Sequence, residues 1–252
     1  MSLSSPLSNE FKNKLTRRIA RYGGLLLCTD FDGTLVSFTG TPDETELETE
    51  TESLLVKLAT QEGLNLAVIS GRSLSELIAL VPIEGITLAG NHGLRIRFED
   101  GSRHEIETGQ KIHRVISDFK AELQERLGKK DGVIIEDKHF GLALHYRQYD
   151  GDSEKVKDNF EDLWSEYSIP ELELIKGAQL LEIRPENWNK GDAVKLIQER
   201  RDKLPTIYIG DDTTDEDAFN VLRNQDIGIP ILVSPNEESE TKAQYRLRNP
   251  AE

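Results

Sequence analysis

The stretch LLLCTDFDGTLV at residues 25–36 runs from a continuous apolar segment into two aspartates, Asp30 and Asp32. Such an unbroken apolar run is typical of a strand buried on both faces of a parallel sheet. Residues two apart on a strand point to the same face, so both carboxylates can face one site. Taken alone, the pattern also fits an aspartate in a turn or an N-cap position, with Gly33 supplying flexibility.

Further apolar runs recur along the chain and are separated by amphipathic stretches. Together with the first they are GLLLCT (24–29), LNLAVIS (64–70), GITLAG (85–90), TIYIG (206–210) and IGIPILV (227–233). Between the first two, the leucines of residues 45–63 recur at roughly helical spacing, and Gly63 is a candidate helix stop. A strand–helix–strand unit implies a right-handed crossover, so the pattern predicts a doubly wound α/β core on a parallel sheet.

The middle of the chain has a different pattern. Residues 94–108 alternate about Asp100-Gly101, a strong hairpin signal. Helices are predicted near 109–128 and 152–167. Strands are predicted at VIIED (133–137), FGLALHYR (140–147) and LELIKGAQLLEIRP (172–185), the last with a turn at Gly177. The sequence therefore predicts an antiparallel α+β domain over 91–186, inserted into a core formed by 1–90 and 187–252.

Composition narrows the classes of partner. The 252 residues include 31 basic and 46 acidic side chains, a net charge of −15, which repels nucleic acid and anionic membranes. A phosphate site must therefore be built locally. The single cysteine, Cys28, excludes a disulfide within the chain and fits a buried thiol. There is no signal-peptide pattern and no apolar run of 18 residues, so we expect a cytoplasmic protein.

Polar side chains follow several predicted strands at the same end, and Lys190 opens the helix before TIYIG. Ligands of open α/β sheets bind at the carboxyl ends of the strands. The acidic residues expected to converge there are Asp30, Asp32, Asp211, Asp212 and Asp215. Such carboxylates repel one another unless a cation lies among them, and Mg²⁺ prefers oxygen ligands. The sequence therefore favours chemistry over a simple turn and predicts a Mg²⁺ site.

The spacing Asp-x-Asp-Gly-Thr, then Ser70, then Lys190, then Gly-Asp-Asp-x-x-Asp resembles the four motifs of the haloacid dehalogenase superfamily, in the same order and element context. The resemblance implies a core of that fold and a phosphoaspartyl mechanism. Asp30 is then the nucleophile, and Asp32 is the general acid and later the base. Ser70 and Lys190 are expected to hold the phosphoryl oxygens.

The same resemblance implies the metal ligands. Mg²⁺ would be bound by Asp30, the backbone carbonyl of Asp32 and Asp211, with Asp212 and Asp215 supporting that shell. About 37 residues separate Asp32 from Ser70, whereas some 120 separate Ser70 from Lys190. The inserted α+β domain is thus expected to be a cap of the C2 type, which covers the site and reads the leaving group.

Beyond the four motifs, the amino-acid sequence resembles those of trehalose-6-phosphate phosphatases along nearly the whole chain. The similar segments are DFDGTL (30–35), VISGRS (68–73), AGNHGLRI (89–96), EDKHFGLALHYR (136–147), LEIRPENWNKGDAV (181–194) and GDDTTDEDAF (210–219). The resemblance implies hydrolysis of trehalose 6-phosphate, the last step of trehalose biosynthesis. Relatives usually continue into a final helix beyond AQYRLRN, and some carry a fused synthase domain. We expect a monomer that works with a separate trehalose-phosphate synthase.

Sugar recognition is expected from the cap and from polar residues in the similar segments. By position in those segments the candidates are Arg72, Asn91, His92, Lys138, His145, Arg147 and Glu182. Simpler roles stay open for each. His145 and Arg147 fit the solvent face of a strand, residues 91–93 fit a hinge turn, and Lys138 with Glu182 fits a surface ion pair. Arg72 fits a residue that orients the loop after the second strand, one that binds substrate, or both.

Three other functions stay open on the sequence. The same chemistry serves phosphatases of glucosylglycerol phosphate, sucrose 6-phosphate or mannosylglycerate phosphate. A phosphosugar mutase would use the same phosphoaspartate but transfer the phosphoryl group to a sugar instead of to water. A non-catalytic sensor of sugar phosphates would share the fold, although such proteins often lose an aspartate that this chain retains.

Overall fold

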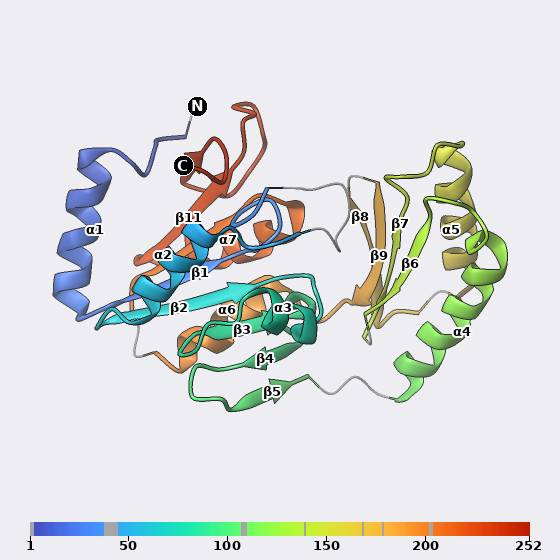
Figure 1. Ribbon diagram of the computed structural model, residues 1–252, viewed down its shortest axis with the longest axis horizontal. Helices are drawn as coiled ribbons and strands as arrows, with labels where there is room; N and C mark the ends of the chain where they lie inside the picture. The colour runs from blue at the N-terminus through green and yellow to red at the C-terminus, as the bar shows by residue number, and fades with distance from the viewer. Residues whose placement is uncertain are drawn as a thin grey trace. The chain divides into compact units, whose positions relative to one another are not determined.

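The computed structural model describes residues 3–37, 45–106, 110–138, 140–167, 169–177, 179–201 and 204–252. The chain forms two compact units (Figure 1). Unit 1 comprises Met1–Glu105 and Asn189–Glu252, and unit 2 comprises Ile106–Trp188. The predicted mixed α/β architecture with an inserted second unit is confirmed.

Unit 1 is built on an eight-stranded sheet with the order β12-β11-β10-β1-β2-β3-β4-β5. The strands from β12 to β3 are parallel, and β4 and β5 are antiparallel. The strands are β1 (Leu25–Thr29), β2 (Leu64–Ile69), β3 (Thr87–Gly90), β4 (Arg95–Arg97), β5 (Arg103–Glu105), β10 (Thr206–Gly210), β11 (Gly228–Val233) and β12 (Tyr245–Leu247). The five predicted core strands are thus confirmed.

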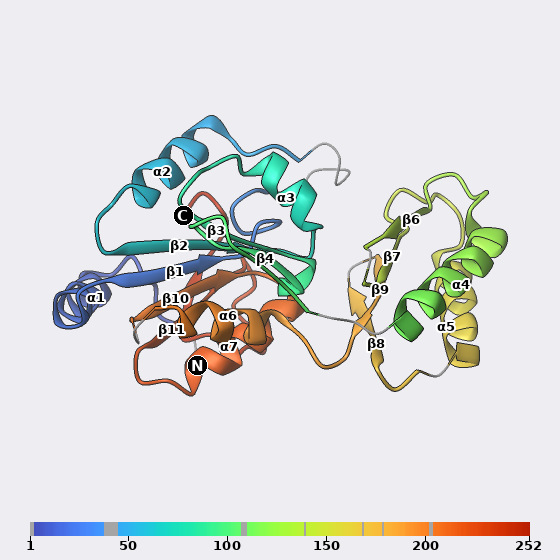
Figure 2. The ribbon, with the colours of Figure 1, turned by 90° about the horizontal axis from the view of Figure 1, so that it is seen from below.

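Helices cover both faces of this sheet (Figure 2). They are α1 (Asn9–Tyr22), α2 (Thr49–Ala59), α3 (Leu74–Leu80), α6 (Lys190–Glu199) and α7 (Glu216–Arg223), with the short 3₁₀ turns η2 (Asn91–Gly93) and η3 (Thr213–Asp215). Alternation along the strands decides which helix packs where. In β1, Leu26 and Cys28 pack with α6 and α7, whereas Leu25 and Leu27 pack with α1 and α2.

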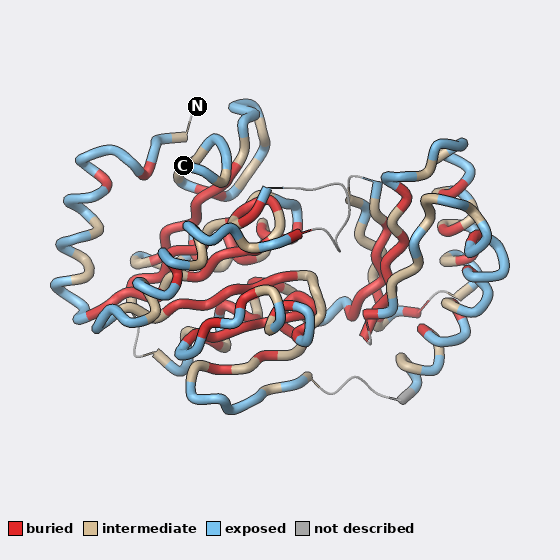
Figure 3. The backbone as a smooth tube through the Cα atoms, in the orientation of Figure 1, coloured by how far each residue is buried: buried red, intermediate tan, exposed pale blue. Residues whose placement is uncertain are grey.

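Burial on both faces explains the continuous apolar runs of the sequence. Figure 3 shows the buried backbone concentrated along the central strands of unit 1. Cys28 is fully buried, as expected, and burial raises the pKa of its thiol. A sheet covered in this way is a rigid platform for the loops at its carboxyl edge.

Unit 2 is a four-stranded antiparallel sheet, in the order β6-β7-β9-β8, with two helices packed on one face. Its elements are α4 (Gln110–Leu127), β6 (Ile134–Asp137), β7 (Leu142–His145), α5 (Ser153–Tyr167), β8 (Leu172–Gly177) and β9 (Leu180–Pro185). Alternate residues such as Leu142, Leu144, Leu181 and Ile183 face the helices and form its core with Phe119 and Phe160. The predicted α+β character is confirmed.

The expected domain boundary at residue 91 is wrong. The hairpin at Asp100-Gly101 forms as predicted, but its strands β4 and β5 extend the core sheet next to β3 instead of joining unit 2. The core therefore continues to Glu105, and on the far side the boundary falls at Asn189 instead of 187. A hairpin pattern specifies the pairing of its own two strands, but nothing in it identifies the sheet that the hairpin extends.

The helix stop predicted at Gly63 is also displaced. α2 ends at Ala59 with Thr60 as its C-cap residue. Gly63 has a positive φ of 77° and lies in the turn directly before β2. Within the described ranges, no helix combines the length and the apolar character needed to cross a bilayer.

Gly90, the last residue of β3, makes a close approach that no larger residue fits. A Cβ atom there would lie 2.3 Å from the backbone nitrogen of Leu74. We predict that Gly90→Ala lowers the free energy of unfolding by about 1–3 kcal/mol, because the first turn of α3 must shift. Urea unfolding measures this. Gly177→Ala, where the nearest atom is 3.5 Å away, should change stability by less than about 0.5 kcal/mol. Equal losses in both variants would contradict the packing argument.

Candidate active site

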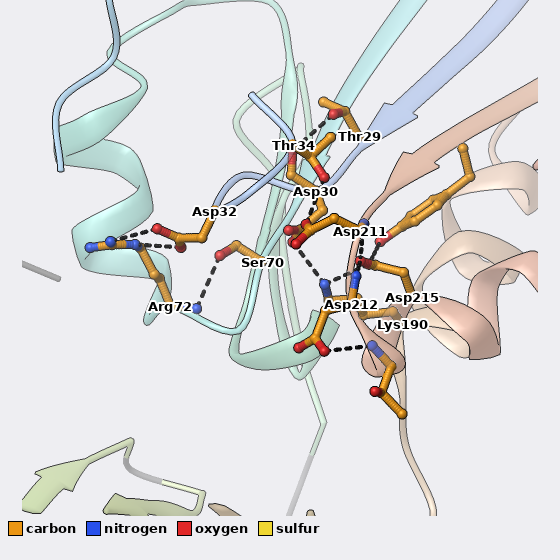
Figure 4. Close-up of polar contacts among 12 residues, drawn as sticks. Thr29, Asp30, Asp32, Thr34, Ser70, Arg72, Lys190, Asp211, Asp212 and Asp215 are labelled. Atoms are coloured by element: carbon orange, nitrogen blue, oxygen red, sulfur yellow. Dashed lines mark hydrogen bonds and ion pairs between the residues drawn. The ribbon is translucent and has the colours of Figure 1, made fainter. Parts of the chain in front are cut away.

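Three neighbouring strands deliver the predicted polar residues to one edge of the sheet (Figure 4). β1 lies between β10 and β2, and all three run parallel. Asp30 therefore follows β1, Ser70 follows β2 and Asp211 follows β10 at the same end. The backbone N–H of Asp30 donates to the carbonyl of Ile209 at 2.8 Å, which fixes the first loop to β10.

The loop after β1 is a tight turn built on Gly33. Its φ of 82° is left-handed, and its N–H donates to the Val36 carbonyl at 2.8 Å. The glycine therefore has the turn role that the sequence allowed. The Asp32 carboxylate has no such turn or capping role, because it accepts from no local backbone N–H among the described residues. It pairs instead with Arg72.

Lys190 connects two of the aspartates. Its Nζ lies 2.7 Å from Asp30 Oδ1 and 2.6 Å from Asp215 Oδ1. Lys190 is only 2% exposed, and Asp30 is 4% exposed. Asn189 caps the start of α6 by accepting from the backbone N–H of Gly191 at 2.8 Å, which sets Lys190 as the first helical residue.

Asp215 has four hydrogen-bond donors around its carboxylate. Oδ1 accepts from Lys190 Nζ and from the Tyr208 hydroxyl, the latter at 2.6 Å. Oδ2 accepts from the backbone N–H groups of Asp211 at 2.9 Å and Asp212 at 3.0 Å. Two bonds on each oxygen occupy the usual acceptor capacity of a carboxylate. Asp215 therefore fixes the loop after β10 and orients Lys190.

The site concentrates negative charge away from water. Burial raises the pKa of Asp30 well above its usual range, although Lys190 opposes the shift. Burial and the Asp215 charge raise the pKa of Asp211 to about 7. Burial lowers the pKa of Lys190, but Asp215 and Asp30 outweigh it, so the net shift is upward. The lysine stays charged, and the local excess of negative charge is unfavourable without a further cation.

The donor set at this edge fits a hard metal ion. Among the described residues, oxygens of Asp30, Asp211 and Asp215 lie within 4.8 Å of one another, although each Asp215 oxygen already accepts two hydrogen bonds. Asp211 Oδ1 accepts from Thr34 Oγ1 at 2.8 Å, which orients that carboxylate. Oδ2 of Asp30 and Oδ2 of Asp211 accept no bond from the described residues. A cluster of carboxylate oxygens is the environment that divalent oxygen-loving cations prefer.

Two of the aspartates expected around the metal have other side-chain contacts. The Asp212 side chain is exposed and accepts from the backbone N–H of Thr213 at 2.5 Å, as the N-cap of η3. The Asp212 carboxylate is not part of the cluster of Asp30, Asp211 and Asp215. Its expected support of the metal shell stays a prediction. The expected Asp32 ligand was its backbone carbonyl, which stays a prediction.

Arg72 holds Asp32 through a two-point ion pair. Nε donates to Oδ2 and Nη2 to Oδ1, both at 2.7 Å. The guanidinium also lies 5.6 Å from the Phe31 ring centroid. The Arg72 backbone N–H donates to Ser70 Oγ at 3.1 Å, so one short loop fixes both Ser70 and Asp32. These contacts fit an orienting role for Arg72, and both that role and its contact with substrate stay predictions.

Asn91 and His92 belong to unit 1 and support that same loop. Both have a positive φ, 53° and 55°, which is uncommon for residues with a side chain. The Asn91 N–H donates to the Arg72 carbonyl at 2.7 Å, and the His92 N–H donates to the Ser70 carbonyl at 2.9 Å. A Cβ on Gly71 would lie 2.8 Å from the His92 ring. The strained turn therefore packs directly on the loop that carries Ser70.

In unit 2, charged residues share the sheet face that points away from α4 and α5. The register places Glu136, Ala143 and Glu182 side by side across β6, β7 and β9, opposite in direction to the apolar core residues. Lys138 and His145, two positions further along, share this face. Lys138 Nζ lies 3.4 Å from Glu182 Oε1, and His145 Nε2 lies 2.7 Å from Glu136 Oε2.

Two expectations about this face need correction. The Lys138–Glu182 pair forms, but both side chains are buried and not on an open surface. β7 ends at His145, so Arg147 is not on the strand with it but exposed in the turn that follows. His145 itself is half-buried.

The sequence did not predict roles for several residues that make contacts at these sites. Tyr208 was counted only as part of an apolar strand, although a buried tyrosine hydroxyl normally needs a partner. Thr34 belongs to the Asp-x-Asp-Gly-Thr motif, but the motif alone does not predict its hydrogen bond to Asp211. Glu136 and Arg184 lie two positions from Lys138 and Glu182, so the period of two along a strand could have identified them. Arg184 Nε donates to Glu173 Oε1 at 2.7 Å on the same face.

Comparisons with known proteins agree on one family. Residues 28–251 match the model of the family described as trehalose-phosphatase. The trehalose-phosphate phosphatase of Mycobacterium avium is 33% identical over 231 residues, which is 88% of this chain and 58% of that protein. The probable trehalose-phosphate phosphatase 3 of rice is 34% identical over 248 residues, covering 90% and 67% respectively. The chain thus spans only about 58% of the length of the mycobacterial relative.

A solved structure supports the fold. The C-terminal domain of the Candida albicans trehalose-6-phosphate phosphatase aligns with a TM-score of 0.80, covering 100% of this chain and 96% of that one. Because the two sequences are only 24% identical, the alignment shows that the two proteins share a fold and nothing more.

The Tyr208 hydroxyl is a buried anchor for Asp215. We predict that Tyr208→Phe lowers the free energy of unfolding by about 1–2 kcal/mol, because one donor to a buried carboxylate is lost. Guanidinium unfolding followed by circular dichroism measures this. Tyr245→Phe in β12 is the matched control, because no hydrogen bond of its hydroxyl occurs within the described part of the chain. If both variants lose the same stability, the Tyr208–Asp215 bond does not carry the effect.

Proposed function

Because the chain belongs to the trehalose-phosphatase family, we propose that it is a Mg²⁺-dependent phosphatase that hydrolyses trehalose 6-phosphate to trehalose and phosphate. The observation that carries the proposal is the buried Asp30, held by Lys190 beside the carboxylates of Asp211 and Asp215. A buried carboxylate next to a fixed ammonium group is suited to attack a phosphoryl group, whose charge must be neutralised.

In the first half-reaction, Asp30 Oδ2 attacks phosphorus and the bond to the sugar oxygen breaks, which leaves a phosphoaspartate on Asp30. Lys190 and Ser70 hold the phosphoryl oxygens. Mg²⁺ would be held by Asp30, Asp211 and the backbone carbonyl of Asp32, and when bound it neutralises charge between nucleophile and phosphate. Asp215 acts through the position of Lys190.

Asp32 moves the proton in both halves of the reaction. It donates to the departing sugar oxygen and later accepts a proton from the hydrolytic water, which releases phosphate from Asp30. In its pair with Arg72, the Asp32 carboxylate is only an acceptor, the form that takes the proton from water. Donation requires the protonated carboxyl group and therefore a rearrangement of the pair. Arg72 is thus a positioning residue for the proton carrier.

The charged face of unit 2 is proposed to recognise the sugar. Trehalose offers many hydroxyl groups, and carboxylates and amines bind them more specifically than an apolar pocket does. Lys138, His145 and Glu182 lie on this face, and Glu136 and Arg184 are added to the earlier candidates. The expected monomer, cytoplasmic location and separate synthase partner stay predictions.

The function is tested by comparing sugar phosphates. We expect kcat/KM for trehalose 6-phosphate to exceed that for glucose 6-phosphate by about a hundredfold or more, because the second glucose adds binding in the transition state. Phosphate release measures this for both, and for glucosylglycerol phosphate, sucrose 6-phosphate and mannosylglycerate phosphate. A higher value for one of these last three would replace the substrate and keep the chemistry.

The mechanism has its own controls. Asp30→Asn should lower kcat by about a thousandfold or more, because the nucleophile is lost. EDTA should abolish turnover, and Mg²⁺ should restore it. Unchanged turnover in Asp30→Asn would contradict the phosphoaspartate on any substrate. A requirement for a sugar bisphosphate would instead indicate a mutase.

Glu182 tests the proposed sugar face. We predict that Glu182→Gln raises KM for trehalose 6-phosphate by about tenfold or more and changes kcat less, because a charged hydrogen bond to the sugar is weakened. Steady-state kinetics measures both constants. Glu161→Gln is the control, because Glu161 lies on α5 and pairs with the exposed Lys176 at 2.8 Å. An unchanged KM in both Glu182→Gln and Glu161→Gln would exclude Glu182 from the sugar site.

A further inference from the structure

A cationic groove runs along α1, separate from the residues discussed so far. Its volume is about 680 Å³. Four basic side chains line it, with two acidic ones: Lys14, Arg17, Arg18, Arg21, Glu10 and Asp226. All of them belong to the described part of unit 1.

The spacing of α1 separates an apolar face from a basic face. Phe11, Leu15 and Ile19, four residues apart, pack against the sheet residues Leu25, Ile207, Ile229 and Ile231. The groove cations fall at the positions i, i+3, i+4 and i+7, counted from Lys14, and so form a second stripe. The helix is fixed at both ends, by the Ser8 side chain that accepts from the Phe11 N–H and by Gly23 in a left-handed C-cap.

Two carboxylates, Glu10 and Asp226, line the groove, but neither forms an ion pair with the stripe. Among the described residues, none of the basic side chains of α1 lies within 4.0 Å of a carboxylate oxygen. By contrast, many other arginines and lysines of the chain do, for example Arg126 and Arg200. Arg18 Nη2 donates to the backbone carbonyl of Asp226 at 2.9 Å, which ties α1 to the turn before β11. The Arg21 guanidinium lies 5.4 Å from the centroid of the Tyr22 ring.

The stripe runs against the charge of the whole chain. α1 has five basic residues and one acidic residue, whereas the remaining sequence has 26 basic and 45 acidic residues. Like charges three and four positions apart destabilise a helix. Of the acidic residues in the described part of the chain, only Glu10 and Asp226 line the groove. The groove is therefore a local electrostatic site for an anion, of the kind that a net charge of −15 does not otherwise supply.

The groove and the proposed active site lie at opposite ends of the strands. α1 directly precedes β1, and Asp226 lies just before β11, so the groove is at the amino ends (Figures 1 and 2). Asp30, Ser70 and Asp211 follow the carboxyl ends. A ligand in the groove is thus not the phosphate that reacts at Asp30.

We propose that this groove binds a small molecule that carries two or more phosphoryl groups. Three of the four cations are arginines, whose planar forks match phosphate oxygens in pairs. A single phosphate has too few oxygens to use four cations spread over two helical turns. The volume lies in the range of sites for small molecules.

Calorimetric titration of the full chain with tripolyphosphate, in EDTA at low salt, tests the proposal. Arg17→Gln/Arg21→Gln should weaken binding by about tenfold or more, because charge-assisted contacts are lost. The matched control is Arg103→Gln/Arg114→Gln, which removes the same charge at exposed positions elsewhere and should change the affinity less than about threefold. Asp30→Asn should bind as the unchanged chain does. Thermal melting checks that each variant is folded.

Several results would overturn the proposal. Equal weakening in both arginine pairs would mean that only net charge matters. A changed affinity in Asp30→Asn, with binding kept in Arg17→Gln/Arg21→Gln, would place the probe in the active site. Orthophosphate binding as tightly as tripolyphosphate would mean a single-anion site. Poly-glutamate binding through α1, with no tripolyphosphate binding at about 1 mM, would indicate an acidic protein partner instead.

Discussion

Lys190 carries a charge that is almost completely removed from water, and such a charge is stable only beside partners of opposite sign. Its two partners, Asp30 and Asp215, come from the ends of β1 and η3, 160 and 25 residues away along the chain. The lysine can reach both only if β1, β10 and α6 are packed in their observed register. The site and the core therefore form together, and the charge pairing at Lys190 links the chemistry to the fold.

Around this pairing, each functional side chain is held by a residue without a direct chemical role. Asp215 is fixed by Tyr208 and by two backbone N–H groups, so that it can orient Lys190. Asp32 is held by Arg72, whose loop is in turn supported by the strained turn at Asn91 and His92. The rigid sheet supplies positions, and these hydrogen bonds supply orientation. The arrangement explains why so much of the edge is buried and polar.

The sequence predicted the core well because its signals are local and redundant. Apolar runs specified β1, β2 and β10, and the parallel arrangement then brought Asp30, Ser70 and Asp211 to one edge. The errors occurred where a local signal has several tertiary outcomes. The hairpin at Asp100-Gly101 was correct, but the sheet it extends was not, and Gly63 marks a turn before β2 instead of the end of α2. Asp212 shares a motif with Asp211, and its side chain caps η3, so its support of a metal shell stays a prediction.

By itself, the sequence determined which polar residues follow the strands at one edge of the core sheet, because apolar runs and strand periodicity are properties of neighbouring positions. It also determined the alternation that separates the charged and apolar faces of unit 2. Only the tertiary structure decided that Asp215 receives four donors, that Tyr208 is one of them, and that Arg72 pairs with Asp32. These contacts join residues from different strands and loops. Their geometry depends on the packing of the whole sheet, which no local pattern encodes.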